Sequence, residues 1–93
     1  MLESTIEKHL VSQVKSLNGK IYKWCSPSNN GVPDRILFLN GQVWFIELKR
    51  PGAKRQRLQV KFAEDIKPFT NNYAVLDSLE KIDKLIVEIM IKF

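Results

Sequence analysis

The chain has 93 residues, 44% of them hydrophobic, and a formal net charge of +5. This length predicts one α/β domain spanning residues 1–93 with a modest core, and the positive charge favours a polyanionic partner such as DNA. No apolar run approaches the roughly 20 residues that a membrane-spanning helix needs, and no signal peptide is visible.

The first predicted element is a helix over about residues 2–17. Its apolar residues repeat at helical spacing: Leu2, Ile6, Leu10, Val14 and Leu17. Glu7 lies on the flank of this stripe, from which a carboxylate can lean over a packed sheet. Glu3 is placed similarly, and periodicity does not choose between them. Alternatively, Ser4 caps the helix with Glu7 three residues on, the capping-box pattern. Asn18-Gly19 is a helix-ending signal.

A strand is predicted over residues 20–25 and a loop over residues 26–33. A single cysteine, Cys25, permits no internal disulfide, which agrees with a reducing cytoplasm, and we interpret it as a buried small hydrophobe. The absence of a Cys/His cluster argues against zinc. The loop is dense in Ser, Asn, Pro and Gly and leads directly into Asp34. Its polar side chains either contact a phosphate backbone or belong to a plain connection.

The next segment has the pattern of a tight β-hairpin. Asn40-Gly41 lies between two apolar runs, and this dipeptide is typical of a two-residue type I′ turn because both residues need positive φ. Such a turn sets Leu39 opposite Gln42. Counting outward from there brings Asp34 opposite Glu47, with their Cβ atoms about 5 Å apart.

The hairpin strands, residues 34–39 and 42–49, are apolar on both faces. One face carries Ile36, Phe38, Val43 and Phe45, and the other carries Leu37, Leu39, Trp44 and Ile46. A strand that is buried on both faces belongs in the middle of a sheet with helices on each side. We therefore predict that Trp44 is a core residue and not a platform for base stacking.

The facing carboxylates call for a cation, because like charges placed opposite each other destabilise a sheet. Oxygen ligands of this kind suit Mg²⁺ or Mn²⁺. Lys49 projects to the same side as Glu47 and adds an ammonium group that can stabilise a phosphate. The alternative is a surface arrangement in which Asp34 caps the turn after Pro33 and Glu47 pairs with Lys49 in solvent.

A basic segment follows the hairpin and holds Arg50, Lys54, Arg55 and Arg57. It is either a solvated loop or a surface that holds a phosphodiester near the acidic pair. A helix is predicted over residues 56–69, with core spacing at Leu58, Phe62, Ile66 and Phe69. Gln59 lies off this stripe, near the helix start, where it either serves the site or is an ordinary surface residue.

A strand over residues 72–76 and a helix over residues 79–93 complete the predicted order αβββαβα. Asp77-Ser78 is the expected N-cap of the last helix. Val87 and Ile91 give this helix a second apolar patch, which indicates a partner interface.

The strings GVPDR at residues 31–35 and FIELKRPG at residues 45–52, together with Gln59, resemble the VRR-NUC domain. This domain is a branch of the PD-(D/E)XK nuclease superfamily, found in phage and prophage proteins and in some eukaryotic repair nucleases. Glu7 matches the glutamate of its first helix, and the resemblance runs from about residue 6 to residue 78. It implies a restriction-endonuclease-like α/β core, with a central mixed sheet flanked by helices.

The resemblance also implies a metal-dependent phosphodiesterase acting on DNA. The expected catalytic set is Asp34, Glu47, Lys49, Glu7 and Gln59. Asp34 and Glu47 are expected to hold Mg²⁺ or Mn²⁺, with Glu7 and the backbone carbonyl of Leu48 as further ligands. Lys49 is expected to position or deprotonate water or to stabilise developing charge.

The implied substrate is branched DNA, with four-way (Holliday) junctions foremost. Expected DNA contacts are Arg35, Arg50, Lys54, Arg55 and Arg57. Cutting a junction on two strands needs two active sites, which predicts a symmetric homodimer. The expected setting is the cytoplasm of a bacterium carrying a phage or prophage. A nuclease for flaps or linear duplex and a non-catalytic DNA-binding module remain the alternatives.

Overall fold

The computed structural model describes residues 1–25 and 33–91. Its elements are α1 (Glu3–Ser16), β1 (Lys20–Lys23), β2 (Arg35–Leu39), β3 (Gln42–Leu48), α2 (Arg57–Ile66), β4 (Tyr73–Leu76) and α3 (Leu79–Ile91). This is the predicted order αβββαβα, with every element close to its expected place and a few residues shorter. The predicted loop over residues 26–33 lies outside the described residues except for Pro33, which is fully buried.

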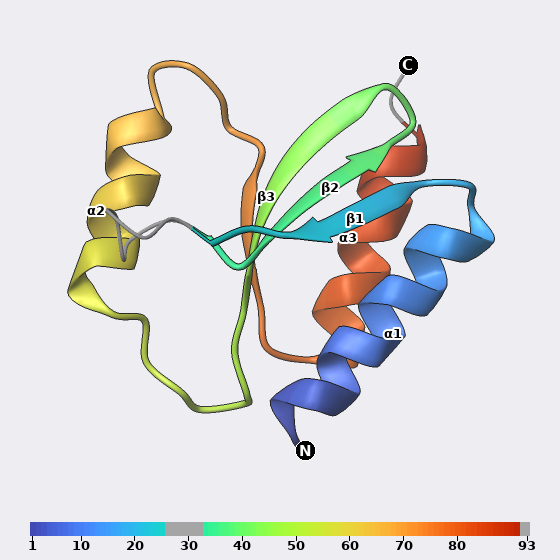
Figure 1. Cartoon of the computed structure of the whole chain (residues 1–93), viewed down its shortest axis with the longest axis horizontal. Coiled ribbons are helices and arrows are strands. Elements are labelled where there is room, and N and C mark those ends of the chain that lie inside the picture. Colours follow the sequence, from blue (N-terminus) through green and yellow to red (C-terminus); the bar gives the residue numbers. More distant parts are fainter. Residues whose placement is uncertain (26–32, 92–93) are drawn as a thin grey trace.

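The strands form one mixed sheet in the order β1-β2-β3-β4. The first three strands are antiparallel, and β4 runs parallel to β3. A parallel neighbour needs a crossover connection, and α2 provides it. Figure 1 shows α1 and α3 side by side against one face of the sheet and α2 on the other side. The prediction of a central mixed sheet flanked by helices is confirmed.

The hairpin has the predicted register. Asn40 and Gly41 have φ angles of 52° and 73°, as a type I′ turn requires. Leu39 pairs with Gln42, and the ladder continues through successive pairs to Arg35 and Ile46. The turn is also anchored, because the Asn40 side chain donates a hydrogen bond to the Ile89 carbonyl of α3 at 2.8 Å. The residues that follow the ladder outward are therefore fixed in position.

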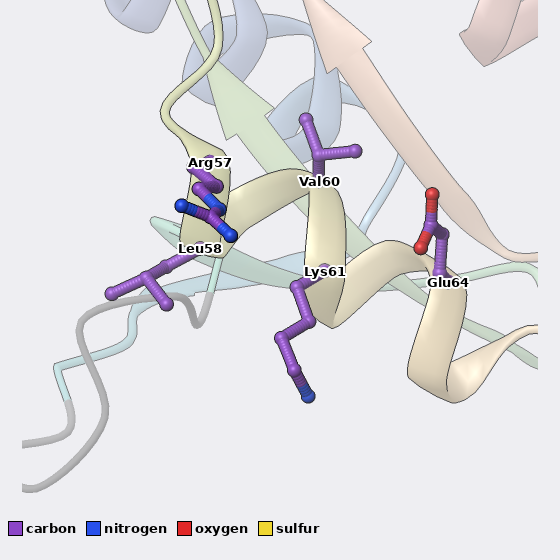
Figure 2. A pocket seen from close by; sticks show the side chains of 5 residues that line it. All are labelled: Arg57, Leu58, Val60, Lys61 and Glu64. Atoms are coloured by element: carbon purple, nitrogen blue, oxygen red, sulfur yellow. The ribbon is translucent and has the colours of Figure 1, made fainter.

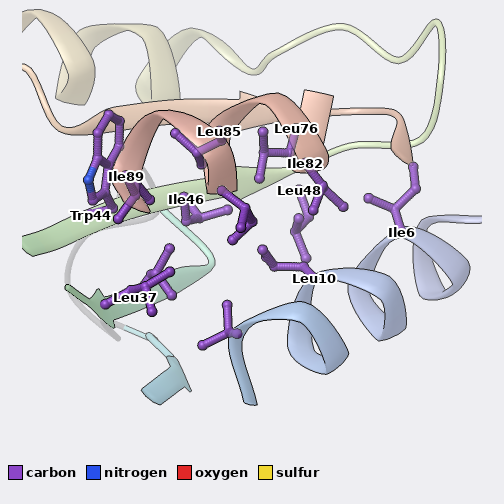
Figure 3. Close-up of a cluster of buried hydrophobic side chains, with 13 residues drawn as sticks. Ile6, Leu10, Leu37, Trp44, Ile46, Leu48, Leu76, Ile82, Leu85 and Ile89 are labelled. Atoms are coloured by element: carbon purple, nitrogen blue, oxygen red, sulfur yellow. The ribbon is translucent and has the colours of Figure 1, made fainter. Parts of the chain in front are cut away.

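The core fills the space between the sheet and the α1/α3 pair (Figure 3). Its members are Ile6, Leu10, Val14, Leu37, Leu39, Trp44, Ile46, Leu48, Leu76, Ile82, Leu85, Ile86 and Ile89. Burying each large apolar side chain contributes about 1.5–3 kcal/mol. Trp44 is buried, and its indole nitrogen donates to the Gln42 side chain at 2.9 Å. Its predicted core role is confirmed.

The opposite face of the sheet is only half covered. Phe62 of α2 packs against Trp24, Phe45 and Tyr73 with ring centroids 5.9–6.3 Å apart. Phe38 and Val43, nearer the hairpin turn, are each 42% exposed. The expectation that both hairpin faces are buried is therefore wrong for this half, because α2 packs over the other end of the strands.

Several local predictions were also wrong. Phe69 is 85% exposed and Leu58 is exposed, because α2 ends at Ile66 and turns Leu58 away from the sheet. Cys25 is exposed, since β1 ends at Lys23 and no sheet face remains to bury it. No side chain caps α1 at Leu2, which rules out the predicted capping box.

Two predicted helix ends are present in the structure. Asn18 has a φ of 62° after α1, and the Gly19 amide donates to the Val14 carbonyl at 2.9 Å. The Ser78 hydroxyl accepts the Lys81 amide at 3.2 Å, which confirms the predicted cap of α3.

His9 hydrogen-bonds Asp83 at 2.7 Å and so joins α1 to α3. Among the described residues, no helix is long and apolar enough to cross a membrane.

Candidate active site

Asp34 is held at the end of the hairpin by backbone amides from the segments on its two sides. Its carbonyl accepts the Trp24 amide at 2.8 Å, next to β1. Its side-chain Oδ2 accepts the Leu48 amide at 2.9 Å, at the end of β3. A carboxylate fixed in this way points across the hairpin toward β3. The sequence-predicted approach of Asp34 to the Glu47 segment is thus present.

Glu47 is the most deeply buried charged residue of the described chain, with 1% of its surface exposed. Its Oε2 accepts a hydrogen bond from Gln59 at 2.7 Å and lies 3.8 Å from the Lys49 Nζ. Its Oε1 is buried with no hydrogen-bond partner. A buried carboxylate oxygen without a partner is costly, which makes this atom the natural place for a cation.

The pKa of the Glu47 carboxyl is raised from 4.5 to about 8, chiefly because the group is buried. The charge of the neighbouring Asp34 contributes to this rise, while the Lys49 and Arg55 cations oppose it. The hairpin register continues one residue beyond the Arg35–Ile46 pair to Asp34 and Glu47, so the two carboxyl groups are close neighbours. Because Glu47 is buried, the alternative of a solvent-exposed pair with Lys49 is excluded.

Gln59 connects α2 to the carboxylates. Its Oε1 accepts the Gln56 amide at 2.9 Å, so its amide nitrogen faces Glu47. It is the one residue of α2 that is buried, which excludes the ordinary surface interpretation. The predicted proximity of Gln59 to the site is present, with the first turn of α2 setting its orientation.

Arg55 lies over the ring of Tyr73, a residue that the sequence did not single out. The guanidinium carbon is 5.5 Å from the ring centroid, and Nη2 lies 3.4 Å from the Tyr73 hydroxyl. Nη2 also lies 3.5 Å from the Gln59 carbonyl. Burial raises the pKa of the Tyr73 hydroxyl, Arg55 lowers it, and the charge of Glu47 raises it, so all three groups share one environment.

Tyr73 is brought to the site by the pairing of its strand, β4, with β3. Because β4 is parallel to β3, Tyr73 pairs with Phe45, two residues before Glu47 and on the same face. Once this pairing is known, the alternation of side chains along a strand assigns Tyr73 to the sheet face that carries Glu47. The pairing itself comes from the crossover and is not visible in the sequence.

Glu7 reaches the site indirectly. It pairs with the Arg35 guanidinium, whose Nη1 donates to the Asp34 carbonyl at 3.0 Å. Among the described residues, no three His, Cys, Asp or Glu side chains gather into a metal-binding group. Glu3 is exposed at the start of α1, so Glu7 is the better placed of the two. Direct metal binding by Glu7 and DNA contact by Arg35 stay predictions.

Comparisons with known proteins agree with this geometry. No family model matches the chain. The chain is 43% identical over 77 residues to "Putative nuclease p44" of Acyrthosiphon pisum secondary endosymbiont phage 1, covering 82% of this chain and 83% of that protein. A solved structure described as "VRR_NUC domain" superposes with a TM-score of 0.82 at 26% identity, covering 91% of this chain and 94% of that one. The chain belongs to the VRR-NUC family.

The basic residues of this VRR-NUC chain divide into two groups. Arg50, Lys54 and Arg57 are exposed on the segment that leaves β3. Arg55 instead packs against Tyr73 beside the carboxylates. The predicted basic segment is therefore largely exposed, with one arginine turned inward, and its contact with a phosphodiester stays a prediction.

The outer face of α2 is separate from the carboxylates. A hollow of about 640 Å³ lies on this face. Figure 2 shows the side chains that line it projecting from the helix: Arg57, Leu58, Val60, Lys61 and Glu64. Gln59, within the same helix, faces Glu47 instead. In the VRR-NUC fold of this chain, α2 thus carries one site residue inward and an open, charged surface outward.

Proposed function

We propose that this VRR-NUC protein is a metal-dependent DNA endonuclease that hydrolyses phosphodiester bonds. The observation that carries the proposal is the Glu47 Oε1 atom, which is buried without a partner beside Asp34. Two close carboxylates with an unsatisfied oxygen fit a hard divalent cation, since Mg²⁺ and Mn²⁺ prefer carboxylate oxygens and tolerate substrate and water as further ligands.

Asp34 and Glu47 would hold the ion, with the Leu48 carbonyl and Glu7 as further proposed ligands. Bound Mg²⁺ or Mn²⁺ supplies polarisation of the scissile phosphate and acidification of water. Coordination also favours the ionised form of Glu47, which burial opposes.

The protein's own cations act on the substrate. Lys49 lies 3.8 Å from Glu47, where its ammonium group can hold the attacking water or stabilise charge on the phosphate. Arg55 adds a second positive charge whose guanidinium is fixed by the Tyr73 ring. Gln59 holds Glu47 in one orientation through its 2.7 Å hydrogen bond. These three side chains surround the two carboxylates and are held in place before a substrate binds.

We further propose that the substrate is branched DNA, with four-way junctions foremost. Exposed Arg50, Lys54 and Arg57 would contact phosphates and make binding salt-dependent and largely independent of sequence. Cutting two strands of a junction needs two sites, which a symmetric homodimer supplies. The exposed residues Val87 and Ile91 of α3 are candidates for its interface. The proposed setting is the cytoplasm of the phage's bacterial host.

The test is cleavage of plasmid and of labelled junctions, flaps and duplexes by purified protein with Mg²⁺ or Mn²⁺. Metal-dependent cleavage that is abolished in Asp34→Ala would support the proposed nuclease activity. Symmetric paired nicks in the four-way junction would support junction resolution. Cutting confined to flaps or linear duplex would favour the second substrate class. DNA binding without cleavage under any of these conditions would leave a non-catalytic binding module.

A further inference from the structure

The sheet face that carries Glu47 continues beyond the candidate site as an uncovered surface. Strand pairing places Lys20, Tyr22, Phe38 and Val43 on this face. Tyr22 is 57% exposed, and Phe38 and Val43 are each 42% exposed. We call these four residues the hairpin patch. It is open because α2 packs only over the half of the face near Phe45.

The two aromatic rings of the hairpin patch are available to a ligand. Tyr22 and Phe38 meet edge to face, with centroids 6.2 Å apart and planes at 74°. In this arrangement neither ring is stacked on the other. A shallow hollow of about 430 Å³ adjoins Phe38 and Val43. Its remaining lining residues are Asn18, Lys20, Leu39, Asn40, Gly41 and Gln42.

The charge of this region favours a polyanion. Lys20 is the charged residue that lines the hollow, and no carboxylate is among the lining residues of the described chain. In the sequence from residue 18 to residue 46, Asp34 is the one acidic residue. In a dimer with its two-fold axis through this patch, the patch would pack against its own copy. The two Lys20 side chains would then face each other, with no acidic side chain of the patch to pair with them. A nucleic acid avoids that repulsion.

The patch also lies within reach of a strand in the candidate site. Phe38 is four residues from Asp34 along β2, and Val43 is four residues from Glu47 along β3. At about 3.3 Å per residue the separation is roughly 13 Å, or about four stacked nucleotides at 3.4 Å each. One DNA strand can therefore occupy the acidic pair and the patch together.

We propose that the hairpin patch binds unpaired bases of a DNA strand whose adjoining duplex lies at the carboxylates. Every base has a face that stacks on an aromatic ring, whereas the bases of an intact duplex are stacked on each other. Among branched DNAs, one that carries a single-stranded stretch beside the duplex would thus bind more tightly than a fully paired one. This inference rests on the proposed nuclease function and adds a selectivity device to it.

The experiment measures DNA affinity by fluorescence anisotropy in the cleavage-deficient Asp34→Ala background. Three ligands share one duplex: a blunt form, a form with a short oligothymidine tail, and a form with an abasic tail of equal length. The thymidine tail should tighten binding at least about fivefold over the blunt duplex, since one stacked base contributes on that order. The abasic tail, with the same phosphates and no bases, should give little of this gain.

Tyr22→Ala and Phe38→Ala, made singly and together, should bring the ratio of tailed to blunt affinity down toward that of the abasic tail. Phe69→Ala is the matched control, because Phe69 is an exposed phenylalanine after α2 and outside the patch. It should keep the full gain. Circular dichroism would verify that each variant is folded.

Patch variants that bind the tailed duplex as tightly as their parent would overturn the proposal. So would variants that turn a dimer into a monomer in analytical ultracentrifugation and lose affinity for all three DNAs equally, since the patch would then be an interface between copies. A patch-dependent gain in a protein whose wild-type form cuts nothing with Mg²⁺ or Mn²⁺ would refute the nuclease proposal and leave the binding site standing.

Discussion

Replacing Glu47 with glutamine is expected to stabilise the metal-free protein at pH 8. The pKa of Glu47 is raised from 4.5 to about 8, chiefly by burial, so folding disfavours the ionised form. At 1.36 kcal/mol per pKa unit, this difference corresponds to roughly 5 kcal/mol at most. Small domains have a free energy of unfolding of about 5–15 kcal/mol, so one carboxyl group removes a large part of it.

The sign follows from proton linkage. The folded protein binds the Glu47 proton more tightly than the unfolded chain, so the contribution of Glu47 to the free energy of unfolding is most favourable below pH 4.5. It falls as the pH rises from 4.5 to about 8 and then levels off. In Glu47→Gln the side chain stays neutral, and its carbonyl oxygen can still accept the hydrogen bond from Gln59. This part of the pH dependence should therefore disappear.

The assay is urea unfolding of both proteins at several pH values between 4.5 and 8 in the presence of EDTA. Glu64→Gln, the same substitution on the exposed face of α2, is the control and should keep the wild-type pH dependence. Adding Mn²⁺ at pH 8 should stabilise the wild type and leave Glu47→Gln nearly unchanged. Equal pH dependence in wild type and Glu47→Gln would refute the reasoning.

Three further predictions follow from the same geometry. Lys49→Met should abolish cleavage while retaining Mn²⁺ binding by calorimetry, and lost metal affinity would mean that its role is wrongly assigned. Gln59→Ala removes the donor to Glu47 and should weaken Mn²⁺ binding about tenfold or more; an unchanged dissociation constant would contradict this role. Gly41→Ala, at a φ of 73°, should cost about 1 kcal/mol in urea unfolding, and an unaltered midpoint would show that the turn tolerates a side chain.

The hairpin could be predicted because its information is local. Asn40-Gly41 fixes the turn, the turn fixes the register, and alternation then assigns each face. This chain of short-range constraints reached Asp34 and Glu47 without any knowledge of the tertiary structure. The helices were similarly visible in their apolar repeats, and Asn18-Gly19 and Ser78 marked two of their ends, although the end of α2 at Ile66 was not visible.

The remaining parts of the site depend on contacts between distant segments. Tyr73 joins it through the parallel pairing of β4 with β3, and Arg55 then folds onto that ring. Glu7 was expected at the carboxylates, but the position of α1 brings it to Arg35. The packing of the helices likewise determines which half of the sheet face α2 covers. The exposure of Phe38 therefore could not be predicted from the apolar sequence around it.

The most direct measurement is an anomalous difference map from crystals grown in Mn²⁺ at or above pH 8, where Glu47 ionises. A peak lying between the side chains of Asp34 and Glu47, absent in Glu47→Gln, is the predicted result. A map with no peak there, or with Mn²⁺ bound only elsewhere, would contradict the divalent-ion site on which the proposed chemistry depends.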